Sequence, residues 1–136
     1  RKINETLPQF IVKDILTKLK AHSIAIAKAK VLLLGATFKE NTADIRNSKA
    51  ITLAKGLKAE GVNLTLYDPY IIKDNPLEKA LTLTRSLSKA EKFDIVILAV
   101  GHHQFKKIEP LKLLTDKGFG YDIKAYFQSH PRIYRL

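Results

Sequence analysis

The sequence predicts an α/β domain with a doubly wound, mainly parallel sheet of five or six strands, flanking helices and a preceding N-terminal helix. Short apolar runs rich in β-branched residues and leucine alternate with stretches of helical periodicity. The runs at 31–34 and 94–100 are apolar at nearly every position, which is typical of strands buried on both faces. Residues 31–49, VLLLGATFKENTADIRNSK, place a strand, a polar loop and a helix start in the order of a βαβ unit.

A helix is predicted over 7–24, because Leu7, Ile11, Ile15 and Leu19 step by four. Thr6 and Pro8 mark its N-cap and first turn, so residues 1–5 are expected to belong to a preceding segment. The chain contains no methionine. We therefore expect it to be a fragment of a longer protein.

The first strand is expected at 30–35, followed by a helix from about 48 to 60. Asn47 or Ser48 caps this helix, and its apolar residues fall on one side: Ala50, Ile51, Leu53, Ala54 and Leu57. Gly61 is a natural residue for its end. The second strand is expected at 62–67, closed by Asp68-Pro69 because proline cannot continue a ladder.

The second half alternates less regularly. Residues 71–79 are expected to form an irregular excursion, 81–84 a short strand, and 87–92 a brief helix, since Ser88 and Glu91 have capping-box spacing. The run at 94–100 is expected to be a central strand. One or two short helices interrupted at Pro110 are predicted over 104–116, then a strand at 119–123 and an edge strand at 132–136.

Charge favours anionic partners. The 136 residues include 24 Lys and Arg against 13 Asp and Glu, a formal net charge of +11. Such a balance suits nucleic acid, an anionic membrane surface or phosphorylated small molecules. The lysines are scattered over predicted helix faces, which argues against nucleic acid. No apolar run approaches the length of a membrane span, and the absence of cysteine excludes disulfides, a thiolate nucleophile and cysteine metal sites. These features fit a cytoplasmic protein.

Polar residues follow the predicted strands, and in doubly wound sheets ligands bind beyond the carboxyl ends of the strands. They are Lys39, Asp44, Arg46, Asp68, His102, His103, Asp122 and Lys124. A helix start near loop cations suits phosphate, although solvated cations would have the same pattern. Asp44 fits an Asx-turn as well as a ligand contact. Asp68 fits a role in the Asp-Pro turn, and His102 a hydrogen bond to the neighbouring loop.

No catalytic constellation is evident. Gly35 is followed by Ala-Thr-Phe-Lys and not by the glycines of a dinucleotide-binding loop, which argues against NAD binding by this unit itself. A serine nucleophile elbow is absent, and adjacent histidines without a carboxylate at ligand spacing make a poor metal site. We therefore assign no catalytic residue and no metal ligand.

Several motifs resemble the C-terminal domain of the UDP-glucose/GDP-mannose dehydrogenases, a Rossmann-like domain. The first runs G-x-x-F-K-x-N-T-x-D-x-R-x-S-K, with Gly35, Phe38, Lys39, Asn41, Thr42, Asp44, Arg46, Ser48 and Lys49. Further matches are Tyr67-Asp68-Pro69, then Ala99-Val100-Gly101-His102 with Phe105, then Tyr121-Asp122-Ile123-Lys124. Arg1, Ile3 and Asn4 resemble the end of the family's central helical region, with Glu5 in place of Asp. The segment DIRNSK at 44–49 is similar to the corresponding segment of the branch that oxidises UDP-N-acetylhexosamines.

The resemblance implies a division into the end of a central linker helix region at 1–29 and a nucleotide-sugar-binding domain at 30–136. The full enzymes oxidise C6 of a nucleotide sugar to a carboxylate in two NAD-dependent steps, for polysaccharide or capsule precursors. In these enzymes NAD is held mainly by an N-terminal domain, and a cysteine upstream of the present sequence forms the thiohemiacetal. Phe38 would line the substrate pocket, Lys39 would contact the sugar nucleotide, and Arg46 would reach the NAD pyrophosphate.

The same resemblance implies a homo-oligomer for the full-length enzyme and no dehydrogenase activity for this part alone. Its partners would be a nucleotide sugar and the NAD-binding domain of the same chain, with no nucleic acid and no membrane. The competing hypothesis is a non-catalytic nucleotide-binding or regulatory α/β module.

Overall fold

A parallel sheet forms the centre of the computed structural model, which describes residues 7–46, 48–71, 80–84, 86–88 and 90–136. Its strands are β1 (Lys30–Leu34), β2 (Asn63–Tyr67), β3 (Thr82–Thr84), β4 (Phe93–Leu98), β5 (Leu114–Asp122) and β6 (Ile133–Arg135). Their order is β3-β2-β1-β4-β5-β6, and every neighbouring pair is parallel. The doubly wound α/β fold is thus confirmed, with six strands among the described residues.

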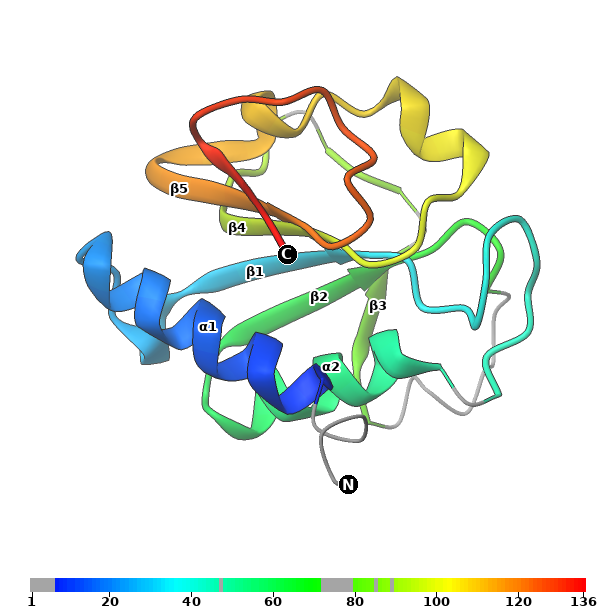
Figure 1. Ribbon diagram of the computed structural model, residues 1–136, viewed down its shortest axis with the longest axis horizontal. Helices are drawn as coiled ribbons and strands as arrows, with labels where there is room; N and C mark the ends of the chain where they lie inside the picture. Colours follow the sequence, from blue (N-terminus) through cyan, green and yellow to red (C-terminus); the bar gives the residue numbers. More distant parts are fainter. Residues whose placement is uncertain (1–6, 47, 72–79, 85, 89) are drawn as a thin grey trace.

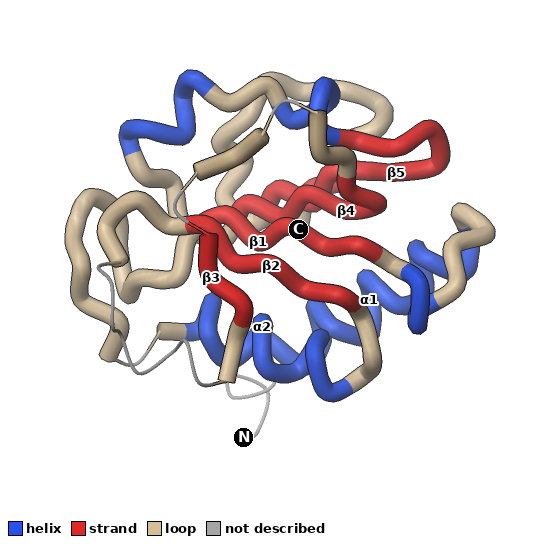
Figure 2. Tube along the Cα trace, turned by 180° about the vertical axis from the view of Figure 1, so that it is seen from behind, coloured by secondary structure: helices blue, strands red, loops and turns tan. Residues whose placement is uncertain are grey.

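The two faces of the sheet are covered differently (Figures 1 and 2). Helices α1 (Leu7–Ala21) and α2 (Lys49–Ala59) pack side by side on one face, and the short helix η2 (Ile26–Lys28) leads into β1. Two 3-10 helices, η4 (His103–Lys107) and η5 (Pro110–Leu113), cover the other face. Val31 and Leu33 pack toward the α-helices, whereas Leu32 and Leu34 pack toward the 3-10 side. This confirms the expected burial of β1 on both faces.

Most predicted elements are present with boundaries shifted by a few residues. Ser48 caps α2 by accepting a hydrogen bond from the Ile51 N–H, whereas Asn47 and Thr6, the other proposed caps, lie outside the described residues, as do residues 1–5 and 72–79. The short strand after them and the C-terminal edge strand are both confirmed.

Two expectations are wrong. The described residues of 87–92 form a turn and not a helix: the Ser88 hydroxyl and carbonyl accept from Ala90 and Glu91. Strand β5 begins at Leu114, five residues before the expected Phe119. The polar residues that follow Leu114 hide the first part of β5 from pattern analysis. Its register against β4 shifts between Phe93 and Ile95, and Arg132 donates to the Thr115 and Gly118 carbonyls there.

Polar side chains connect α1 and the residue after it to the last two strands of the sheet, β5 and β6. Tyr121 of β5 donates its hydroxyl to the Asp14 carboxylate at 2.6 Å, and Lys18 forms an ion pair with Asp14 at 2.7 Å. His22 lies 2.8 Å from the Tyr134 hydroxyl of β6. Burial raises the pKa of the Tyr121 hydroxyl, and the bond to Asp14 and the Asp14 charge raise it further. The Tyr121 hydroxyl therefore keeps its proton at neutral pH and donates it to Asp14.

Replacing Asp14 by Asn is expected to make the free energy of unfolding depend less on pH in the acid range. Burial by itself raises the pKa of the Asp14 carboxyl, but the bonds from Lys18 and Tyr121 and the Lys18 charge leave it below its ordinary value. A carboxyl with a lowered folded pKa stabilises the protein above its unfolded pKa, and the gain is lost as pH falls. We expect Asp14→Asn to cost about 1 kcal/mol at pH 7, because the pair is partly exposed.

Urea unfolding across pH 2.5–7 measures this difference. The difference should begin to shrink as pH falls through about 4, the ordinary carboxyl pKa, and should close only below the lowered pKa of the folded state, where the wild-type carboxyl is protonated. Asp116→Asn, at an exposed position of β5, is the matched control and should show no such pH dependence. A cost for Asp14→Asn that is equal at pH 3 and pH 7 would contradict the assigned role of the charge.

Candidate functional site

The switch point of the sheet lies at the carboxyl end of β1. From β1 the chain passes through α2 to β2 on one side, and it later returns to β4 on the other side. The loop after β1 and the loop after β4 therefore lead to opposite sides, which leaves a crevice between them. The candidate site lies in this crevice, between the 36–46 loop and the end of β4.

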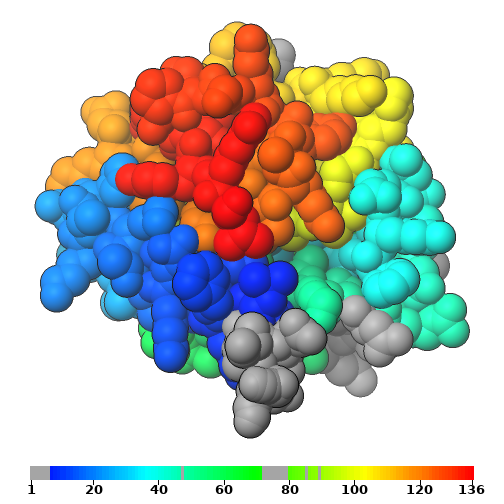
Figure 3. All heavy atoms as spheres, in the orientation of Figure 1, coloured from blue at the N-terminus to red at the C-terminus, as the bar shows by residue number. Residues whose placement is uncertain are grey.

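The backbone after β1 approaches the segment after β4 very closely. Gly35 has a φ of 99°, and its N–H donates to the Tyr67 carbonyl at the end of β2. An added Cβ at Gly35 would lie 2.6 Å from the Val100 Cβ, so only glycine lets the two strand ends approach. Figure 3 shows the 36–46 loop (cyan) on the surface beside the segment around 100–107 (yellow).

A cavity of about 270 Å³ lies in this crevice, and we call it the rim pocket. Residues from four places line it: the loop after β1, the first turn of α2, the end of β4 and the loop after β5. They are Thr37, Phe38, Lys39, Glu40, Lys49, Ala50, Ala99, Val100 and Lys124. The site is therefore built from segments that the fold alone brings together.

Positive charge dominates the rim pocket. Lys39, Lys49 and Lys124 line it together with Glu40 as its one carboxylate, and none of the three lysines forms an ion pair with another described residue. The first turn of α2 carries no acidic residue, so its N–H groups and dipole also favour an anion. A pocket with these groups can bind phosphate or diphosphate.

Of the three predicted site residues, two line the rim pocket and the third does not. Phe38 and Lys39 line the rim pocket, and the Phe38 side chain is 56% exposed. Arg46 is not among the lining residues; its guanidinium bonds Asp44 at 3.0 and 3.1 Å. Asp44 also accepts from the Arg46 N–H, so it forms the Asx-turn, which was one of its two expected roles. The Arg46 bonds hold the pKa of the Asp44 carboxyl below its ordinary value, and Asp44 raises that of Arg46.

Asp68 and His102 are buried beneath the loop. Asp68 Oδ2 accepts from the Ala36 N–H at 2.7 Å and lies 2.8 Å from His102 Nε2. Its Oδ1 accepts from the Tyr70 N–H, which confirms the expected role in the Asp-Pro turn. The Asn41 N–H donates to His102 Nδ1 at 2.9 Å, so His102 bonds the neighbouring loop, as predicted.

Sequence reasoning missed Lys49 as a pocket residue. The signal was present, because Lys49 directly follows the cap Ser48 and so occupies the first position of α2. Lys124 was placed on the rim and does line the pocket. Its neighbour Asp122 does not: it is buried, and its Oδ2 accepts from the Phe127 N–H.

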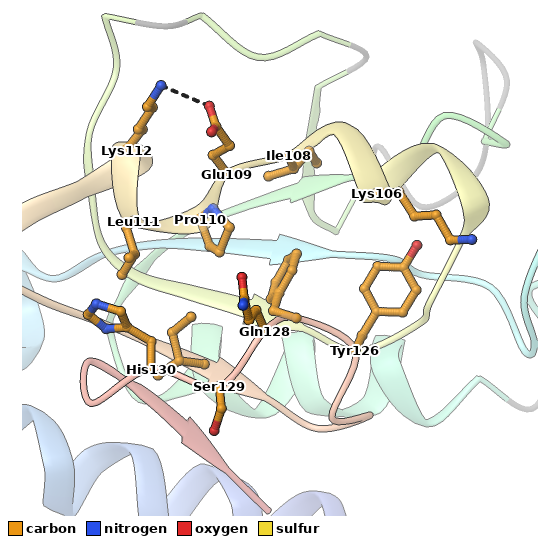
Figure 4. Close-up of a pocket in the computed structure, with 12 residues that line it drawn as sticks. Lys106, Ile108, Glu109, Pro110, Leu111, Lys112, Tyr126, Gln128, Ser129 and His130 are labelled. Atoms are coloured by element: carbon orange, nitrogen blue, oxygen red, sulfur yellow. Dashed lines mark ion pairs between the residues drawn. The ribbon is translucent and has the colours of Figure 1, made fainter.

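A larger cavity of about 490 Å³ lies elsewhere, between η4, η5 and the chain at 126–133 (Figure 4). In Figure 4, Lys112 forms its ion pair with Glu109 at the margin, and Tyr126 and His130 line the opposite side. Its ionic groups are partly paired, and none of its lining residues lines the rim pocket. Among the described residues, no helix is long and apolar enough to cross a membrane, and no cluster of three metal-ligating side chains occurs.

Comparison with known proteins finds relatives that match this chain over its whole length. The chain is 30% identical over its whole length to a UDP-N-acetyl-D-glucosamine 6-dehydrogenase of Salmonella typhi, and it spans 33% of that relative. It is 33% identical to protein CapL of Staphylococcus aureus, again over its whole length and 34% of the relative. The chain thus spans about a third of the length of these relatives.

The fold also recurs in solved structures. The whole chain superposes on 32% of the UDP-D-ManNAc dehydrogenase of Pyrococcus horikoshii with a TM-score of 0.76 at 24% identity. Residues 32–129 match the family described as UDP-glucose/GDP-mannose dehydrogenase family, UDP binding domain. This match covers most of the chain and includes every residue that lines the rim pocket. The chain therefore belongs to the UDP-glucose/GDP-mannose dehydrogenase family and contains its UDP binding domain.

Proposed function

We propose that this chain is the UDP-sugar-binding domain of an NAD-dependent dehydrogenase that oxidises the C6 hydroxyl of a UDP-N-acetylhexosamine to a carboxylate. The observation that carries the proposal is the rim pocket, where three lysines and the start of α2 surround a cavity at the switch point of the sheet. The names of the relatives support the substrate class, since they include UDP-N-acetyl-D-glucosamine and UDP-N-acetyl-D-mannosamine dehydrogenases.

In this proposal the rim pocket holds the diphosphate of the substrate. Lys39 contacts the sugar nucleotide from the loop, and Lys49 and Lys124 approach from two other segments. Charges from three directions compensate a diphosphate and fix its orientation, which places the reacting carbon precisely. Phe38 supplies an apolar wall beside the charges.

Arg46 has a different proposed role, because it lies outside the rim pocket. Asp44 holds its guanidinium at the exposed edge of the loop, where the Arg46 side chain is 85% accessible. From this position it contributes a cation to the NAD pyrophosphate across a cleft to the rest of the enzyme. Guanidinium suits such bidentate contact with phosphate oxygens.

The principal NAD site does not fit this chain. Asp68 stands where a dinucleotide fold places its ribose-binding carboxylate, yet it is 1% exposed. Its oxygens already accept from Ala36, Tyr70 and His102. We therefore propose that NAD is bound mainly outside this chain, that residues 1–29 end a central helical region, that the full enzyme is a homo-oligomer in the cytoplasm, and that this part alone has no dehydrogenase activity.

Calorimetric titration of the purified chain with UDP, UDP-N-acetylglucosamine, GDP and NAD tests the proposal. Saturable binding of the uridine nucleotides is expected. Lys39→Ala should weaken it by about 1.5–3 kcal/mol, the scale of a hydrogen bond to a charged group. Lys55→Ala, which removes the same charge from an exposed position of α2, is the matched control and should have little effect.

A different pattern would sink the proposal. If all four ligands bind weakly and equally, if binding collapses with salt, and if Lys55→Ala weakens it as much as Lys39→Ala, then net charge alone accounts for the binding.

A further inference from the structure

The strongest unassigned feature is the hydrogen-bonded group around His102, which we call the His102 clamp: His102, Asp68, Thr37 and Asn41. His102 is 0% exposed and lies just beyond the end of β4. The Tyr70 and Phe105 rings pack against its imidazole, with centroids 4.6 and 5.3 Å away. The Tyr126 hydroxyl donates to its main-chain carbonyl at 2.8 Å. A fully buried imidazole held this way has a single orientation.

The partners of the ring determine its protonation. The Asn41 main-chain N–H can only donate, so His102 Nδ1 must carry a lone pair to accept it at 2.9 Å. The proton therefore lies on Nε2, which faces Asp68 Oδ2 at 2.8 Å and Thr37 Oγ1 at 3.1 Å. His102 is thus the neutral Nε2–H tautomer, and it connects an acceptor at the end of β2 with a donor in the loop after β1.

The clamp holds the loop on both sides of the proposed substrate residues. On one side, the Thr37 hydroxyl contacts Nε2 and donates to the Lys39 carbonyl at 2.8 Å. On the other side, Asn41 has a φ of 57°, its N–H bonds Nδ1, and its Oδ1 accepts from the His103 N–H. Phe38 and Lys39 lie between these two anchors and line the rim pocket. Loop geometry at Lys39 therefore depends on His102.

We propose that His102 is a positioning residue of the nucleotide-sugar site: as the neutral Nε2–H tautomer it holds Thr37 and Asn41, and so presets Lys39 for the diphosphate. This inference rests on the proposed function of the rim pocket. A loop ordered before binding loses less conformational entropy when the ligand arrives, so affinity depends on the clamp. His102 itself does not line the pocket and acts through Lys39.

Two substitutions separate the two halves of the imidazole. His102→Asn keeps an oxygen near the position of Nδ1, which can accept from Asn41, but it does not reach Asp68. His102→Gln keeps an N–H near the position of Nε2 for Asp68 and leaves the Asn41 N–H without its acceptor. His130→Gln is the matched control, because His130 Nδ1 also accepts a main-chain N–H, from Arg132, but on an exposed loop outside the rim pocket.

UDP affinity, measured by calorimetry, should fall about tenfold in His102→Gln, because the loop loses its anchor at the Asn41 N–H, and much less in His102→Asn, which keeps that anchor. His130→Gln should not change it. The Lys39→Ala penalty should shrink in the His102→Gln background, because a lysine that is no longer preset has less to lose. A purely structural His102 would leave the Lys39→Ala penalty unchanged in that background.

The outcomes distinguish the two proposals. If the wild-type chain does not bind UDP, the function of the rim pocket and the role of His102 both fail. If it binds UDP but His102→Gln and His102→Asn lose equal affinity, and the losses add to that of Lys39→Ala, the positioning role alone is overturned. A long-range ¹H–¹⁵N spectrum of the unsubstituted protein, which needs no variant to fold, should show a protonated Nε2 at His102; a protonated Nδ1 would also overturn it.

Discussion

Gly35→Ala is expected to lower the free energy of unfolding by about 2–5 kcal/mol, combining a left-handed backbone cost with overpacking. Gly35 has a φ of 99°, and a Cβ there would lie 2.6 Å from the Val100 Cβ and 2.9 Å from the Val100 nitrogen. Backbone atoms cannot swing aside as a flexible side chain can. The end of β1 must therefore move away from the end of β4, where Val100 lines the rim pocket.

The matched control is Gly61→Ala. Gly61 has a similar φ of 105°, but no atom lies within 4 Å of the added Cβ. It measures the backbone cost by itself, about 1 kcal/mol. Urea unfolding followed by circular dichroism compares the two variants, and UDP titration should show reduced affinity for Gly35→Ala alone. Equal destabilisation by both substitutions would refute the steric part of the argument.

Asp68→Ala is expected to cost about 3–5 kcal/mol, because it leaves three neutral donors without their acceptor, each at a cost of about 1–3 kcal/mol before the loops relax. The carboxylate accepts from the Ala36 and Tyr70 N–H groups and from His102 Nε2, all within 2.8 Å. These donors come from three loops at the carboxyl edge of the sheet. Their loss should loosen the end of β1, the Asp-Pro turn and the His102 clamp together.

Asp116→Ala is the control, since Asp116 is exposed on β5 and such substitutions usually change stability by about 0.5 kcal/mol or less. Asp68→Asn should fall between the two. Its single oxygen cannot serve donors on both sides of the group, so an amide N–H must face another donor. Chemical unfolding at pH 7 ranks the three variants, and a cost for Asp68→Ala no greater than that for Asp116→Ala would contradict the structure.

Local sequence patterns predicted much of the fold, because strand burial and helix capping leave a signature in residues that are close together in the chain. The apolar runs of β1 and β4 indicate burial on both faces, and the cap Ser48 precedes an amphipathic helix. The same reasoning failed at 87–92, where capping-box spacing was present. A helix that short has too few bonds to offset its nucleation, so the described residues stay in a turn.

Strand β5 shows the opposite failure. The residues that follow its first residue Leu114, Thr115 to Lys117, are polar and half-buried or exposed, so no alternation marks them as a strand. Arg132, at least 14 residues later in the chain, donates to the Thr115 carbonyl at the start of that stretch and to the Gly118 carbonyl just after it. Pairing with β4 and this distant guanidinium decide the conformation there, and neither is visible within a local window.

The sequence by itself determined the doubly wound fold and the loop that carries Phe38 and Lys39, and it gave the Asx-turn as one of two roles for Asp44. These depend on residues close together in the chain. Only the tertiary structure decided that Lys49 and Lys124 share a pocket with Lys39, and that Arg46 stays outside it on Asp44. Only it joined His102 to Asp68 and Asn41, which lie 34 and 61 residues away. The physical reason is the parallel sheet, which brings the carboxyl ends of strands distant in the chain to one edge and buries their polar groups against one another.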